Sequence, residues 1–97
     1  MKTLYDIKTA LKERKKELYD RYSVKKVGVF GSYVRGEQRR GSDLDVLVEF
    51  EEPVSLLKLA SLENFLSDLL GAKVDVVPEK DIRSELKKRI LSEAVYV

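Results

Sequence analysis

The sequence contains neither cysteine nor histidine. Without cysteine the chain has no disulfide, no thiolate zinc site and no cysteine nucleophile. Without histidine, any acid–base or metal chemistry has to use carboxylates, lysine, tyrosine or serine. The sequence also lacks an apolar run near the roughly 20 residues that a membrane-spanning helix needs, and residues 1–16 are charged throughout, unlike a signal peptide. We therefore expect a cytoplasmic protein with no membrane association.

The composition is typical of a small soluble domain. Apolar residues make up 43% and charged residues 37% of the 97 residues, so we expect one domain, residues 1–97, with a single core. The net charge of +2 is unevenly distributed, because residues 1–27 carry nine basic and four acidic side chains and residues 28–52 carry three and six. A solvated helix face is the favoured interpretation of the basic segment, and steering of anions is the alternative.

Hydrophobic periodicity predicts an α/β (α+β) fold with a small mixed β-sheet of about three strands, packed by three to four helices. The connection between the first two strands is too short for a crossover helix, so these strands are expected to be antiparallel. The predicted elements are a helix over 3–21, a strand over 24–30, a loop with one helical turn over 31–43, a strand over 44–50, a helix over 55–70, a strand over 73–77 and a helix over 81–93.

Particular residues set the ends and faces of the predicted helices. Ser55 and Gly71 are expected to cap the helix over 55–70, and Asp81 is expected to cap the last helix. The apolar face predicted for the helix over 55–70 consists of Leu56, Leu59, Leu62, Phe65, Leu66, Leu69 and Leu70.

Gly31 and Ser32 directly follow the first predicted strand. A glycine at this point lets the backbone approach a ligand, and N–H groups at the start of a helical turn bind phosphate. On these two residues alone an ordinary turn is the more common interpretation.

Three aspartates are the candidate metal ligands. Asp43 and Asp45 are two residues apart at the start of a strand, so their side chains point to the same face and repel each other unless a cation lies between them. Asp75 lies inside the apolar strand over 73–77 and reaches the same site if the two strands are neighbours. Such a site could hold one or two Mg²⁺ ions and take a proton from an attacking hydroxyl. Exposed strand edges are the alternative for all three residues.

The segments GSYVRG at 31–36 and GSDLDVLV at 41–48 resemble the signature of the minimal nucleotidyltransferases, which belong to the DNA polymerase β-like nucleotidyltransferase superfamily. The similarity extends over nearly the whole chain, including LLGAKVDVV and the final EAVYV. The resemblance implies the nucleotidyltransferase fold, ATP as substrate and Mg²⁺ as cofactor.

The resemblance also implies roles for individual residues. Gly31 and Ser32 would contact nucleotide phosphate, and Asp43, Asp45 and Asp75 would be the catalytic, metal-binding carboxylates. Two further positions belong to the nucleotide-binding loop. Arg35 would bind phosphate or brace the loop by pairing with an acidic neighbour, and Ser42 would serve in nucleotide binding or as a loop or cap residue.

Members of this family are often encoded beside a HEPN-domain toxin and act as its antitoxin. The resemblance thus implies a protein adenylyltransferase that moves AMP from ATP to a tyrosine of a HEPN toxin, in a type VII toxin–antitoxin system. Two alternatives stay open at this point. One is a non-catalytic module that neutralises its partner by contact, and the other is nucleotidyl transfer to a nucleic acid or a small molecule, of which a nucleic acid is possible but not favoured.

Overall fold

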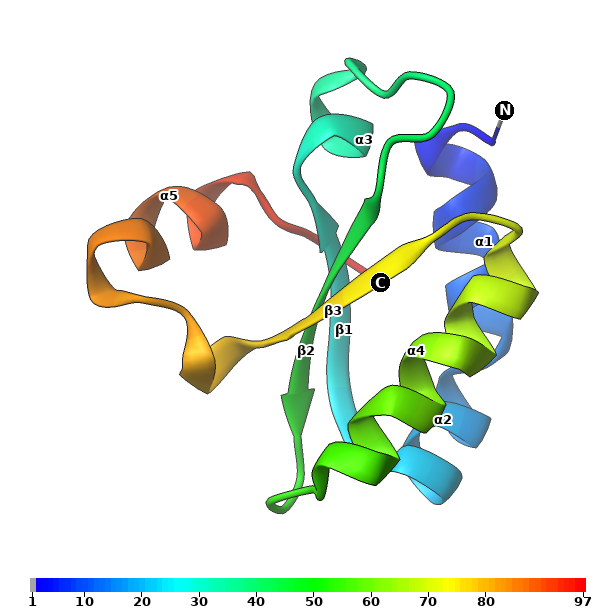
Figure 1. Ribbon diagram of the computed structural model, residues 1–97, viewed down its shortest axis with the longest axis vertical. Helices are drawn as coiled ribbons and strands as arrows, with labels where there is room; N and C mark the ends of the chain where they lie inside the picture. Colours follow the sequence, from blue (N-terminus) through cyan, green and yellow to red (C-terminus); the bar gives the residue numbers. More distant parts are fainter. Residues whose placement is uncertain (1) are drawn as a thin grey trace.

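The computed structural model describes residues 2–97, which form five α-helices, a 3₁₀ turn and one sheet (Figure 1). None of the helices in this range is long and apolar enough to cross a membrane. The elements in chain order are α1 (Leu4–Glu13), α2 (Lys15–Tyr22), β1 (Val24–Phe30), α3 (Ser32–Arg35), β2 (Leu44–Phe50), α4 (Leu56–Leu70), β3 (Val74–Pro78), η1 (Glu79–Asp81), α5 (Ser84–Glu93) and β4 (Val95–Tyr96).

The sheet has four strands in the order β3-β2-β1-β4. β1 pairs antiparallel with β2 and with β4, whereas β2 pairs parallel with β3. The prediction of a mixed sheet with an antiparallel first pair is thus confirmed. The fourth strand was not predicted, because a two-residue strand is too short to show an alternating pattern.

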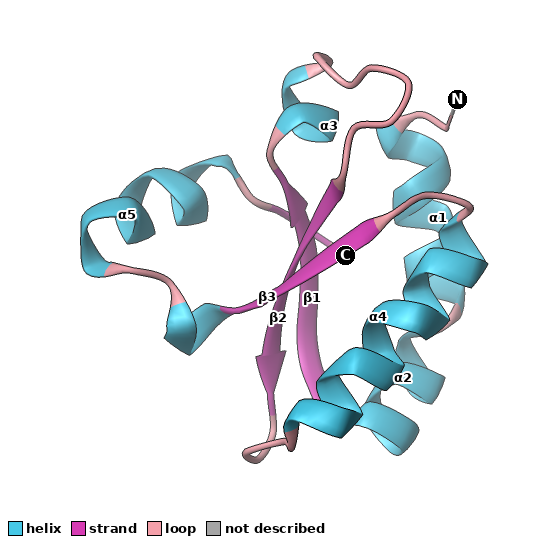
Figure 2. Cartoon of the chain, in the orientation of Figure 1, coloured by secondary structure: helices cyan, strands magenta, loops and turns pink. Residues whose placement is uncertain are grey.

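Helices cover the two faces of the sheet unequally (Figure 2). α1, α2 and α4 lie together on one face, and α5 lies on the other. The main core fills the space under the three helices and includes Ile7, Leu11, Leu18, Val29, Leu44, Val46, Val48, Leu62, Leu66 and Leu70. A smaller cluster of Phe30, Leu47 and Ile90 attaches α5 to the opposite face. Much of that second face therefore remains free to build a site.

The predicted helix over 3–21 is wrong in one respect, because the chain forms two helices that meet at Arg14. Ile7 and Leu11 are buried in α1, and Leu18 is buried in α2. The turn between them, around Arg14 and Lys15, carries no apolar residue that could hold a continuous helix against the core. The first helix begins as a capping box, in which the Thr3 hydroxyl and the Asp6 carboxylate each accept from the other residue's N–H.

The two later helices differ from the prediction at their first turns. Ser55 and Gly71 cap α4 as expected, but Leu56 is 85% exposed and does not belong to the buried face. The last helix begins at Ser84, and Asp81 ends the 3₁₀ turn instead of capping α5. The extended backbone of Ile82 and Arg83 separates the 3₁₀ turn from α5. The apolar pattern that predicted one helix over 81–93 therefore spans two separate elements.

The small cluster under α5 gives a first testable expectation. Leu47 is fully buried between the sheet and α5, so Leu47→Ala removes apolar contacts and leaves a cavity. We expect this change to lower the free energy of unfolding by about 2–4 kcal/mol in urea titrations. Leu57→Ala is the matched control, since Leu57 is 82% exposed, and it should cost less than about 0.5 kcal/mol. Equal effects of the two changes would contradict this account of α5.

Candidate active site

The three predicted aspartates lie at one end of the sheet, and Asp45 and Asp75 lie on the face that carries α5. Leu44 and Val46 point into the main core, so the alternation of β2 turns Asp45 to the opposite face, and Asp43 precedes it by two residues. Asp75 is the direct partner of Asp45 in the parallel pairing of β2 with β3. Partner residues of adjacent strands point to the same face, so the structure places Asp45 and Asp75 side by side.

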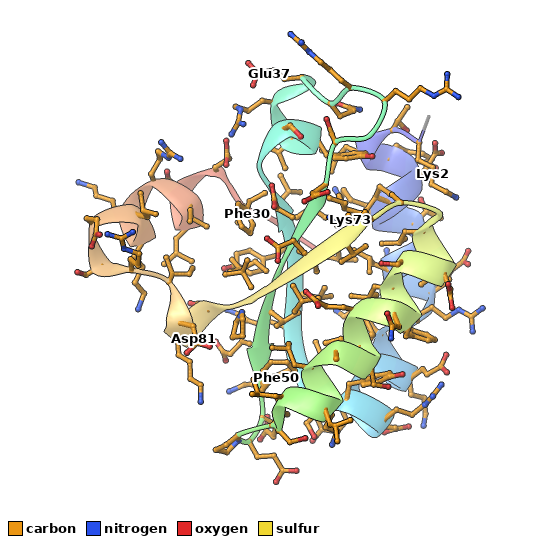
Figure 3. The ribbon with its side chains drawn as sticks, viewed as in Figure 1. Lys2, Phe30, Glu37, Phe50, Lys73 and Asp81 are labelled. Atoms are coloured by element: carbon orange, nitrogen blue, oxygen red, sulfur yellow. The ribbon has the colours of Figure 1, made fainter. Side chains whose placement is uncertain are left out.

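A row of three side chains crosses the sheet at this point. Phe30 is the partner of Asp45 on β1, and Asp75 is its partner on β3. Figure 3 shows Phe30 on the α5 side of the sheet, and its ring belongs to the cluster that holds α5. Asp45 therefore has an aromatic ring on one side and a carboxylate on the other.

This environment disfavours a charge on Asp45. Burial raises the pKa of Asp45 to about 6, with further contributions from the negative charges of Asp75 and Asp43, and the positive charge of Arg35 offsets only part of the effect. A carboxylate held in this way gains from a nearby cation, because the cation removes both the repulsion and the cost of burial.

The aspartates fit Mg²⁺ as a partial set of ligands, which water and substrate phosphate would complete. Within residues 2–97, no three acidic side chains stand close enough to one another to form a ready-made cage for a metal ion. The Asp43 carboxylate points towards Lys73, whose Nζ lies 4.0 Å from it (Figure 3 marks Lys73 near the start of β3). Mg²⁺ in nucleotide-dependent enzymes commonly uses one or two carboxylates and completes its shell with water and substrate phosphate. The aspartates suit that arrangement.

The turn after β1 approaches these carboxylates closely. Because β1 is antiparallel to β2, the end of β1 meets the beginning of β2, and Gly31 lies against Asp45. Gly31 has φ 81° and ψ −153°, and a β-carbon there would collide with Oδ2 of Asp45. Only glycine fits both the backbone conformation and the space.

Gly31 also starts the short helix α3. Its carbonyl accepts from Val34 N–H at 3.0 Å and from Arg35 N–H at 3.2 Å. The N–H groups of Ser32 and Tyr33 precede these bonds, so helix geometry gives them no partner within α3. The predicted helical turn in this loop is confirmed.

Arg35 is held by two carboxylates rather than left free at the loop surface. Its Nε donates to Oε1 of Glu37 at 2.7 Å, and its Nη1 donates to Oε1 of Glu93 at 2.6 Å. Of the two roles expected for Arg35, bracing of the loop by an acidic neighbour matches these contacts. Glu93 itself was missed by the sequence reasoning, because nothing in the local pattern relates it to a loop about 60 residues earlier.

Ser42 and a group of basic residues complete the surroundings. The Ser42 hydroxyl accepts from Arg39 N–H at 2.8 Å, and Ser42 N–H donates to the Arg39 carbonyl at 2.9 Å, which closes the turn before Asp43. This geometry matches the loop role expected for Ser42. A pocket of about 580 Å³ next to this turn is bordered by Lys2, Arg39, Arg40 and Lys73. One of these basic residues, Lys73, also lies beside Asp43.

Comparisons with known proteins show the family to which the chain belongs. A family model for the nucleotidyltransferase domain matches residues 7–97. The chain belongs to the nucleotidyltransferase family. This nucleotidyltransferase is 50% identical to the protein adenylyltransferase MntA of Thermococcus cleftensis over 97 residues, which are 100% of this chain and 98% of that protein.

Solved structures show the same fold. One of them, described as a minimal nucleotidyltransferase, is 41% identical to this chain and has a TM-score of 0.80. The match covers 97% of this chain and 95% of that one. A toxin–antitoxin complex with AMP-PNP matches with 24% identity and a TM-score of 0.73 over 88% of this chain and 69% of that one. A complex of tri-AMPylated Shewanella oneidensis HEPN toxin with MNT antitoxin matches with 19% identity and a TM-score of 0.68 over 93% and 70%. The last two similarities show the fold alone.

The close approach of Gly31 to Asp45 can be tested by adding one methyl group. We expect Gly31→Ala to lower the free energy of unfolding by at least about 2 kcal/mol, because the new β-carbon is strained and displaces the Asp45 carboxylate. Gly36→Ala is the matched control. Gly36 also has a positive φ, of 70°, but no atom lies near its added β-carbon, so a cost of only about 1 kcal/mol is expected. Equal costs in denaturant titrations would show that Asp45 does not confine Gly31.

The raised pKa of Asp45 predicts how stability depends on pH. The folded protein retains a proton on Asp45 up to about pH 6, whereas the ordinary value is 3.8, so the free energy of unfolding should fall as the pH rises from about 4 to about 6. Asp45→Asn removes this penalty. Without divalent ions it should stabilise the protein by about 1–2 kcal/mol at pH 7.5, and the gain should vanish below pH 4.

The control for this change is Asp20→Asn, which affects an exposed pair with Lys16 and should alter stability by less than about 0.5 kcal/mol at either pH. Chemical denaturation at pH 4 and pH 7.5 measures both variants. An Asp45→Asn protein that is less stable than the wild type at pH 7.5 would contradict the proposed electrostatics.

Proposed function

We propose that this nucleotidyltransferase transfers AMP from ATP to a hydroxyl of a partner protein in the cytoplasm, in a Mg²⁺-dependent reaction. The observation that carries the proposal is the pairing of Asp45 with Asp75 next to the turn at Gly31. The 50% identical relative that bears the name protein adenylyltransferase MntA, and that matches over nearly its full length, supports protein as the acceptor.

The loop residues would hold the nucleotide. The Ser32 N–H and hydroxyl would donate to the outer phosphates, and Gly31, which has no side chain, would let the phosphates come close to the backbone of the turn. Arg39, Arg40 and Lys73 border the pocket next to the turn before Asp43 and would attract the polyanion. Arg35 would keep the loop in shape through its two carboxylate partners.

Asp43 and Asp45 would be the main ligands of Mg²⁺, with Asp75 adjacent to them. When bound, Mg²⁺ supplies positive charge that offsets the charge of the phosphates and makes the α-phosphorus more electrophilic. Asp45 has a second reason to accept this ion, since its own ionisation is otherwise disfavoured by burial.

Asp75 would serve the acceptor. It is exposed on β3, which is an edge strand, so a large acceptor can approach it without entering the domain. The acceptor hydroxyl would give its proton to Asp75 while its oxygen forms a bond to the α-phosphorus. The bond from the α-phosphorus to the bridging oxygen would break, and pyrophosphate would leave. An open approach of this kind suits a macromolecular acceptor.

We further propose that the acceptor is a tyrosine of a HEPN toxin and that the transfer silences the toxin in a type VII toxin–antitoxin system. The proposal is supported by the fold similarity to a chain of the complex that contains the tri-AMPylated HEPN toxin and MNT antitoxin. It is also supported by the motif that this chain shares with the minimal nucleotidyltransferases.

The transfer can be tested with labelled ATP, Mg²⁺ and the HEPN protein encoded beside this chain. We expect Asp43→Asn, Asp45→Asn and Asp75→Asn each to reduce label transfer by at least about 100-fold, because each removes a charged group from the reacting centre. Asp81→Asn changes an exposed aspartate of the 3₁₀ turn, away from the site, and should leave transfer unchanged. Chelation of Mg²⁺ should stop the reaction.

A measurement of toxin activity can contradict the proposed transfer. If the toxin is neutralised equally by the wild type and by Asp45→Asn, and no label is transferred by either, the chain is a contact inhibitor and the proposed transfer is wrong.

A further inference from the structure

Glu93 connects the C-terminal helix to the glycine turn. Its two carboxylate oxygens have different partners, since Oε2 accepts from Gly31 N–H at 3.0 Å and Oε1 accepts from Arg35 Nη1 at 2.6 Å. These contacts span 62 and 58 residues of the chain. A single side chain thus binds both ends of the segment Gly31–Arg35.

The environment of Glu93 distinguishes it from an ordinary surface ion pair. Its side chain is 19% exposed, compared with 45% for that of Arg35. Burial alone would raise the pKa of Glu93, but the hydrogen bonds from Arg35 and from Gly31 N–H outweigh it, and the pKa lies below the usual value. The Glu93 carboxylate is therefore charged, and both of its oxygens accept hydrogen bonds although other acidic residues lie nearby. An exposed surface ion pair does not need two such partners.

Gly31 is confined from two sides as a result. Its N–H is bound by Glu93, and its α-carbon lies against the Asp45 carboxylate. Any shift of Glu93 therefore changes where Gly31 stands relative to Asp45. Glu93 is the last residue of α5. Ile90, less than one helical turn before it, is buried against Phe30 and Leu47 and so anchors this end of the helix.

We propose that Glu93 is a positioning residue for nucleotide binding, which acts together with Arg35 to hold the Gly31 turn at a fixed distance from Asp45. This inference rests on the proposed function, because it assumes that the turn contacts the nucleotide. It assigns α5 a part in the site even though that helix carries none of the motif residues. It also makes Arg35 a partner of Glu93 instead of a direct phosphate ligand.

The test compares two charge-neutral substitutions on the same helix. Glu93→Gln keeps the size of the side chain and one acceptor oxygen, but it loses the charge and the second acceptor. Glu85→Gln is the matched control, because Glu85 is exposed in the first turn of α5 and, within residues 2–97, forms an ion pair with Arg83 alone. Binding of AMP-PNP in the presence of Mg²⁺ is measured by calorimetry at 25 °C, well below the melting temperature of each variant.

We expect the Kd for AMP-PNP to rise about tenfold in Glu93→Gln and to change less than twofold in Glu85→Gln. An unchanged Kd in Glu93→Gln, with a lower melting temperature alone, would show a purely structural role and overturn the inference. A lower Kd would also overturn it, because Glu93 would then compete with phosphate for Gly31 N–H and Arg35.

A double-mutant cycle tests whether Glu93 and Arg35 act as one unit. Arg35→Lys keeps the charge but loses the planar fork that serves two carboxylates. We expect Arg35→Lys to weaken AMP-PNP binding about as much as Glu93→Gln, and the double variant to be within threefold of either. Losses that multiply in the double variant would mean that Arg35 contacts the nucleotide independently of Glu93.

Binding and transfer separate this inference from the proposed function. A wild-type protein that binds AMP-PNP but transfers no label would refute the transfer reaction and leave the role of Glu93 standing. A wild-type protein that does not bind AMP-PNP at all would refute both.

Discussion

Two carboxylates, those of Asp45 and Asp75, lie directly beside each other on parallel strands, and the small domain has to hold them there against their repulsion. The apolar residues of β2 supply the necessary force. Leu44, Val46 and Val48 are almost completely buried, and a shift of one residue in the register would move them into water and turn Asp45 into the core. The hydrophobic core therefore fixes the acidic site, and the site is formed at the expense of stability on the opposite face.

The connectivity of the sheet explains how a glycine turn reaches the same place. In an all-parallel sheet the turn after β1 and the beginning of β2 would lie at opposite ends. Here β1 and β2 are antiparallel, so Phe30 pairs with Asp45 and Gly31 follows at once. The helix α4 then returns the chain so that β3 runs parallel to β2 and adds Asp75 at the same end. The turn at Gly31, the start of β2 and Asp75 thus meet at one end of the sheet.

Much of this could be predicted from the sequence because the signals are local. The alternation in residues 44–50 and the glycine after residue 30 indicated the strands and the turn, and a spacing of two placed Asp43 and Asp45 on one face. Asp75 was expected near Asp45 only if its strand lies next to β2, and the sequence does not fix the order of the strands. In the structure β3 is the neighbour of β2. Glu93 could not be found in this way, since its partners are Gly31 and Arg35 and no periodic pattern relates them.

The charge of Asp75 also matters for the exposed edges of the sheet. β4 is only two residues long, and β3 is the other edge, with a charged residue at its second position and Pro78 at its end. Short strands, edge charges and proline are the features that keep a sheet from joining that of another molecule. Asp75 thus places a charge on an otherwise apolar edge strand, and a chain without this carboxylate is expected to associate more readily with other copies.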